Sequence, residues 1–162
     1  AAMNSLKYKA ELALVRNQPR ILNLRDLIAQ FIEHRKEVVT KRTEFELRKA
    51  EARLHILEGL KIALDHLDEV ITLIRNSADP TEAKEGLVFK LSLSDIQAQA
   101  ILDMRLQRLT ALEREKIIEE GDELIKTVKN LKEILEKEEL LLDIIIRELE
   151  DIKNRLTKLE KI

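Results

Sequence analysis

The side chains best suited to acid–base or metal chemistry are three histidines and two aspartates. His34, His55 and His66 lie too far apart along an expected helix to share one metal ion. Asp65 and Asp68 flank His66 and could share a helical face, but a solvated helix end is the simpler explanation. The sequence contains no glycine-rich phosphate loop, no HExxH motif and no nucleophile elbow. We therefore predict no catalytic residue, no metal site, no bound cofactor and no small-molecule substrate.

A cluster of cations in the first third of the sequence is a second candidate for function. A basic stretch of helix is typical of a nucleic-acid contact. Carboxylates are interleaved with these cations, so the alternative is ion pairing within the helix or with an acidic partner helix. We favour ion pairing and keep nucleic-acid binding open. The cations are His34, Arg35, Lys36, Lys41, Arg42, Arg48, Lys49 and Arg53.

The composition indicates long helices with narrow seams. Of the 162 residues, 37% are charged, and only three Phe, one Tyr and no Trp are available to fill a three-dimensional core. The absence of cysteine excludes disulfides and thiolate metal sites and favours a cytoplasmic location. No apolar stretch is long enough to cross a membrane, so we expect no membrane partner.

Heptad repeats in the C-terminal third predict one long coiled-coil helix over residues 111–162. Apolar residues recur every seven positions in two series, offset by three or four residues, which places one apolar stripe along a helix. Gly121 and Glu138 break the stripe. The first series is Ile117, Leu124, Leu131, Ile145, Ile152 and Leu159, and the second is Val128, Leu135, Leu142, Leu149 and Leu156.

Another long helix is expected over residues 23–75, with Asn23 as its N-cap. Residues spaced seven apart predict its seam, and the alternate seam positions are basic in the middle of the helix. Gly59 marks an expected bend or stutter, because the phase of the pattern slips there. The seam residues are Leu24, Phe31, Val38, Phe45 and Ala52, alternating with Ile28, Arg35, Arg42, Lys49 and Ile56.

Three capping signatures follow the first long helix. Each pairs an N-cap residue with a Glu or Gln three positions later. They predict short helices over 80–88 and 95–108 and the start of the last helix at 111, so residues 76–110 are expected to form a small helical globule. The pairs are Asp79 with Glu82, Ser94 with Gln97, and Thr110 with Glu113.

The short connection between the two long helices favours antiparallel neighbours. The first helix is basic and the last acidic, which would select the register, while the apolar seam would supply the stability. We therefore predict an all-α fold, in which a long antiparallel two-helix coiled coil carries a small helical dimerisation globule at its tip. Residues 1–22 are expected to hold two short strands around Asn17 to Pro19, or a loop.

The segment 94–109 has apolar side chains on more than one face of its expected helix. Ala98, Ile101, Leu102 and Leu109 can cover one face, while Ile96, Ala100 and Met104 occupy another. A short helix in a small globule cannot bury both faces within its own chain. The excess apolar surface predicts contact with a second protein chain, although a helix sandwiched inside the globule is the alternative.

Long stretches of the sequence resemble the A-type subunits of bacterial type IIA DNA topoisomerases, the family of gyrase A and its topoisomerase IV counterpart. The helix of the globule and the segment after it carry the resemblance in QAQAILDMRLQRLTALEREK. The first long helix carries it in FIEHRKEVVTKRTEFELRKAEARLHILEGLKIALDHLDEVITLIR, and the approach to that helix in LALVRNQPRILNLRDL.

The resemblance implies the coiled-coil and C-gate region of an A-type topoisomerase subunit. In that family two globules meet across a two-fold axis and form the gate through which transported DNA leaves. The partners implied are a second copy of the chain, double-stranded DNA and the B-type ATPase subunit. The implied dimer contacts are Ile96, Gln97, Ala100, Ile101, Met104 and Leu109, with Arg105 and Arg108 as a polar rim.

Departures from the family pattern limit what the resemblance implies. Tyr8 does not match the motif of the family's nucleophilic tyrosine, and Ala111 stands where a glycine is usual. The chain is therefore expected not to cleave or religate DNA by itself. Two alternatives remain: a basic coiled coil that binds nucleic acid, and a scaffold that dimerises along the shaft of the long helices.

Overall fold

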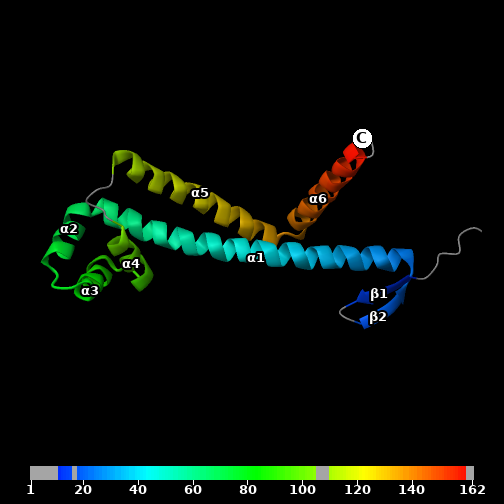
Figure 1. Ribbon diagram of the computed structural model, residues 1–162, viewed down its shortest axis with the longest axis horizontal. Helices are drawn as coiled ribbons and strands as arrows, with labels where there is room; N and C mark the ends of the chain where they lie inside the picture. The colour runs from blue at the N-terminus through cyan, green and yellow to red at the C-terminus, as the bar shows by residue number, and fades with distance from the viewer. Residues whose placement is uncertain (1–10, 16–17, 105–109, 160–162) are drawn as a thin grey trace, which may run out of the picture. The chain divides into compact units, whose positions relative to one another are not determined.

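The computed structural model describes residues 11–15, 18–104 and 110–159, which are almost entirely helical (Figure 1). Within these ranges a small two-stranded sheet precedes six helices, so the predicted all-α class is confirmed. The elements are β1 (Glu11–Val15), β2 (Gln18–Leu22), α1 (Leu24–Asp65), α2 (Leu67–Asn76), α3 (Pro80–Leu91), α4 (Asp95–Asp103), α5 (Ala111–Glu136) and α6 (Glu138–Leu159).

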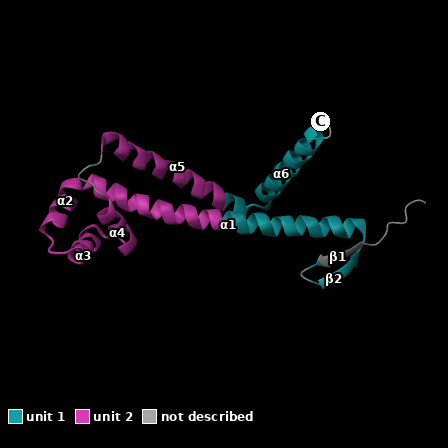
Figure 2. Ribbon diagram, in the orientation of Figure 1, with its two compact units in different colours: residues 1–44, 133–162 teal, residues 45–132 magenta. Residues whose placement is uncertain are grey.

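The chain divides into two compact units (Figure 2). Unit 1 comprises residues 1–44 and 133–162, and unit 2 comprises residues 45–132. Helices α1 and α5 contribute residues to both units. Each unit has its own packed side chains.

Unit 1 begins with a β-hairpin. Strands β1 and β2 pair antiparallel, from Glu11 opposite Leu22 to Val15 opposite Gln18. This confirms the strand alternative for the segment before the first long helix. The helix then starts as predicted, because Asn23 Oδ1 accepts a hydrogen bond from the backbone N–H of Asp26 at 2.8 Å.

The expected helix over 111–162 is interrupted at Lys137, within unit 1. Helix α5 ends at Glu136, and the backbone N–H of Leu140 donates to the carbonyl of Lys137 at 3.1 Å as α6 begins. The interruption falls beside Glu138, the position where the heptads place a charge in the apolar stripe. Without an apolar residue there, no packing holds one straight helix through this point.

The core of unit 2 is a cluster of buried apolar side chains. Ala63 and Val70 come from the two sides of a break at His66, which ends α1 and separates it from α2. The structure therefore has two helices where the sequence predicts one over 23–75. The break lets α2 direct its apolar residues into the same core as the end of α1, which buries more apolar surface than a straight helix could. The cluster is Leu57, Leu60, Ala63, Val70, Leu87, Leu93, Ala98 and Ile101.

The predicted caps are all present. Asp79 Oδ1 accepts from the backbone N–H of Glu82 at 2.8 Å. Ser94 and Gln97 form a complete capping box. At the start of α5, the backbone N–H of Thr110 donates to Glu113 Oε2 at 2.7 Å. The pKa of Glu113 is lowered, first by this backbone hydrogen bond and then by the Thr110 hydroxyl.

Within unit 2, the second half of α1 packs antiparallel against α5. Lys132 lies 2.8 Å from Glu51, and Arg53 donates two hydrogen bonds to Glu120 at 2.7 and 2.9 Å. Between the helices, Ala50 packs with Val128 and Leu131, as the heptads of α5 predict. Leu47, Leu54 and Leu124 surround this contact.

The seam on α1 runs along a different face from the predicted one. Phe45 is 61% exposed, and Val38 and Ala52 are exposed as well. The buried positions are Val39, Thr43, Ala50, Leu57, Gly59, Leu60 and Ala63. Ala50 has little bulk, which lets the helices approach closely, and the leucines beside it bury more apolar surface than the widely spaced phenylalanines could.

Candidate self-association surface

Helix α4 presents one face to the core of unit 2 and another to solvent. Ile96 is 63% exposed, whereas Gln97, Ala98 and Ile101 are buried. Ala98 and Ile101 pack in the core cluster with side chains from α1, α2 and α3. The exposed apolar side chain of α4 is therefore Ile96.

The eight predicted contact residues thus separate into groups. Gln97 and Ile101 are buried in the globule of the same chain. Met104 is half-buried and packs against the core cluster, and Ala100 is half-buried. The remaining three, Arg105, Arg108 and Leu109, lie outside the described residues.

Helix α3 adds an exposed aromatic residue that sequence reasoning missed. Phe89 is 91% exposed, although Ala83 and Leu87 of the same helix are buried. The sequence did contain a signal, because Ala83 and Leu87 are four residues apart and define the inward face of α3, and Phe89 does not continue that spacing. The excess apolar surface predicted for residues 94–109 therefore extends to a second helix.

Contacts between α3 and α4 hold these two side chains on one body. The helices pack directly against each other, and Lys84 of α3 lies 3.6 Å from Asp95 at the start of α4. Ser94 and Gln97 also contact His55 of α1. Phe89 and Ile96 are therefore presented by helices anchored in the same core, as a surface for self-association requires.

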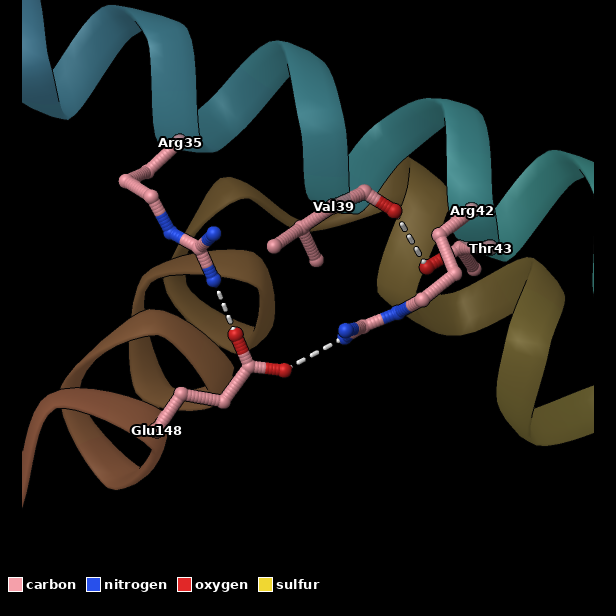
Figure 3. Close-up of polar contacts among 5 residues, drawn as sticks. All are labelled: Arg35, Val39, Arg42, Thr43 and Glu148. Atoms are coloured by element: carbon pink, nitrogen blue, oxygen red, sulfur yellow. Dashed lines mark hydrogen bonds and ion pairs between the residues drawn. The ribbon is translucent and has the colours of Figure 1, made fainter. Parts of the chain in front are cut away.

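Four of the eight predicted cations of α1 pair with carboxylates of other helices: Arg35, Lys36, Arg42 and Arg53. In unit 1, Arg35 and Arg42 both donate to the carboxylate of Glu148 on α6, the latter at 2.6 Å (Figure 3). Lys36 lies 2.6 Å from Glu138, and this hydrogen bond raises the pKa of Lys36 and lowers that of Glu138. In unit 2, the hydrogen bonds from Arg53 lower the pKa of Glu120. These contacts support the ion-pairing interpretation over a nucleic-acid surface.

Within the described ranges, the histidines and carboxylates do not form a metal site. No group of three such side chains is arranged to hold an ion there. His66 lies 3.8 Å from Glu69, and His55 contacts Ser94 and Gln97. None of the helices described is both long and apolar enough to cross a membrane.

Comparison with known proteins identifies the family. The family model for the A subunits of DNA gyrase and topoisomerase IV matches residues 3–150. The DNA gyrase A subunit of Clostridium acetobutylicum is 58% identical over 142 residues, which cover 88% of this chain and 17% of that relative. The corresponding protein from Halalkalibacterium halodurans is 57% identical over 144 residues, 89% of this chain and 17% of the relative.

A third relative gives the same result. The DNA gyrase A subunit of Campylobacter jejuni is 53% identical over 154 residues, 92% of this chain and 18% of the relative. The chain therefore spans less than a fifth of the length of these relatives. Both the family model and the identities cover most of this chain, so the protein belongs to the family of DNA gyrase and topoisomerase IV A subunits.

Proposed function

We propose that this chain is the C-gate module of a gyrase A-type protein and that its globule in unit 2 binds the globule of a second copy. The observation that carries the proposal is the exposure of Phe89 and Ile96 on two helices anchored in one buried core. Large apolar side chains that are this exposed stabilise a protein only when a partner covers them. A symmetric contact between two copies covers both with the same surface.

A contact of this kind suits a gate. The interface must hold two copies together and yet separate when DNA leaves, so a moderate apolar area is more suitable than an extensive one. A few large side chains can supply most of such an affinity. The surrounding charges, including the Lys84–Asp95 pair, would then form the rim.

In the parent enzyme this module would act with the B-type ATPase subunit on double-stranded DNA, in the cytoplasm. The nucleophilic tyrosine of the family belongs to a different motif from that around Tyr8. This chain alone would therefore contribute the gate and would not cleave DNA.

Sedimentation of the full chain tests the proposal. The wild-type chain is expected to dimerise, and Ile96→Glu or Phe89→Glu is expected to weaken the dimer strongly, because each buries a charge in the contact. Both residues are exposed in the single chain, so the helix content should not change. These positions are better probes than Met104, which packs against the core.

A matched substitution on the same unit serves as the control. Ile125 of α5 is 51% exposed, and Ile125→Glu should leave dimerisation unchanged. A monomeric wild-type chain would contradict the proposal. A dimer that tolerates both Ile96→Glu and Phe89→Glu would instead point to contact along α5 or α6, as in a scaffold.

A further inference from the structure

Helix α4 is attached to α1 by a capping box whose two side chains also bind the neighbouring helix. Within the box, the backbone N–H of Ser94 donates to Gln97 Oε1 at 2.9 Å, and the backbone N–H of Gln97 donates to Ser94 Oγ at 3.2 Å. Beyond the box, Gln97 Nε2 donates to the carbonyl of His55 at 2.7 Å. His55 Nε2 also lies 2.7 Å from Ser94 Oγ. The residues that start α4 therefore fix it to α1.

The hydrogen bonds define the orientation of each group in this contact. Gln97 must direct its oxygen to the Ser94 N–H and its nitrogen to the His55 carbonyl, because the reverse would pair donor with donor and acceptor with acceptor. The same nitrogen lies 3.5 Å from His55 Nδ1, so both the backbone and the ring of His55 adjoin the Gln97 amide.

Gly59 allows this close approach. It lies on α1, and a Cβ atom added there would meet Cβ and Cγ of Gln97 at 2.7 Å, a distance that carbon atoms do not tolerate. Gln97 is buried against the bare backbone of α1, while its neighbour Ile96 faces solvent. The bend expected at Gly59 is absent, since the residue lies within the continuous helix α1. Its function is to admit α4.

We propose that Gly59, His55 and Gln97 are positioning residues for self-association, because they set how closely α4 approaches α1 and so how Ile96 is presented to a second copy. This inference rests on the proposed function. Gly59 and Gln97 are buried within the chain, so they would act on the contact through Ile96. A change that moves α4 outward would shift Ile96 relative to Phe89 and spoil the fit of the contact.

Two glycine substitutions test this proposal with a built-in control. Gly59→Ala forces Gln97 away from α1, whereas Gly121→Ala adds the same methyl group on α5 with nothing within 4 Å. Both changes favour the helical state of their own segment, and circular dichroism checks that the helix content of each variant is retained. We expect the dimer dissociation constant, measured by sedimentation of the full chain, to rise about tenfold or more for Gly59→Ala. Gly121→Ala should leave it unchanged.

A second pair of variants separates the two roles of Gln97, which contacts α1 and also caps α4. Gln97→Glu keeps an oxygen for the Ser94 N–H but presents a second oxygen to the His55 carbonyl, so the cap remains and the contact with α1 is lost. We expect weaker dimerisation with α4 still helical. Glu113→Gln makes the reverse exchange in the capping box of α5, whose hydrogen bonds stay within its own first turn, and should not affect the dimer.

The outcomes distinguish this inference from the function on which it rests. A monomeric wild-type chain overturns both. A wild-type dimer that Ile96→Glu disrupts but Gly59→Ala and Gln97→Glu leave intact overturns only the positioning role. If Gln97→Glu unfolds the globule, Gly59→Ala decides: a weaker dimer at unchanged helix content supports the positioning role, and an unchanged dimer overturns it.

Discussion

The two units stabilise the same kind of charged, leucine-rich helix in different ways. Unit 2 buries a continuous apolar cluster from α1, α2, α3 and α4 and a second one between α1 and α5. Among the described residues of unit 1, the buried side chains are Val39, Thr43 and Ile145. There, ion pairs join α1 and α6: Glu148 binds both Arg35 and Arg42 (Figure 3), and Glu138 binds Lys36.

The difference shows that a heptad pattern predicts an apolar stripe but not its burial. The stripe of α5 is buried in unit 2, whereas its continuation on α6 leaves large side chains exposed. Burial of apolar area dominates folding free energy, and partly exposed ion pairs contribute little by comparison. Unit 2 should therefore be the more stable unit. The exposed large apolar residues of α6 are Ile146, Leu149, Ile152, Leu156 and Leu159.

The largest effect should come from a cavity in unit 2. Leu87→Ala removes a fully buried side chain and should cost about 2–5 kcal/mol of unfolding free energy. Ile152→Ala removes a half-exposed side chain of α6 and should cost less than about 0.5 kcal/mol. Urea denaturation followed by circular dichroism measures both values. Equal losses of unfolding free energy in the two variants would contradict the difference in burial between the units.

A smaller effect is expected from the contact that holds α6. Glu148→Gln removes the charge between Arg35 and Arg42, both of which are only partly exposed, and should cost about 1–2 kcal/mol locally. Hydrogen exchange should become faster in α6 and stay unchanged in the buried part of α5. Asp151→Asn, which breaks the exposed Asp151–Arg155 pair on the same helix, is the matched control and should have almost no effect.

The predictions from sequence succeeded where the determinants are local. The caps at Asp79, Ser94 and Thr110 depend on residues three positions apart, so sequence alone identifies them. The stripe of α5 was also predictable, because Val128 and Leu131 lie in an uninterrupted run of heptads.

Long-range packing explains the failures. The face of α1 that packs differs from the one that the seven-residue spacing predicts: Phe45 is exposed, and the small side chain of Ala50 lies against α5. The break at His66 is stabilised by a core built from four helices, which no local pattern reveals. The same holds for Gly59, whose role depends on Gln97 of another helix.

The smallest expected effect is a pH dependence that sharpens the comparison. Hydrogen bonds from Arg53 and Lys36 lower the pKa of Glu120 in unit 2 and of Glu138 in unit 1, respectively. Each carboxylate stabilises its unit above the ordinary carboxyl pKa of 4.5, and that contribution is lost as the pH falls through the lowered folded-state value. Unit 2 loses some unfolding free energy between neutral and acidic pH. Glu120→Gln should make this loss smaller by less than about 1 kcal/mol. Urea titrations at neutral and acidic pH would measure it, and an unchanged acid sensitivity would contradict the pairing with Arg53.

Thiol cross-linking tests most directly whether the globule of unit 2 is the self-association surface. The chain has no cysteine, so single substitutions report one position each. With a short bifunctional thiol reagent, Ile96→Cys is expected to give a covalent dimer in high yield, and Ile152→Cys on α6 should remain largely monomeric. Efficient cross-linking at position 152 with none at position 96 would contradict association through the globule and place the contact along α6.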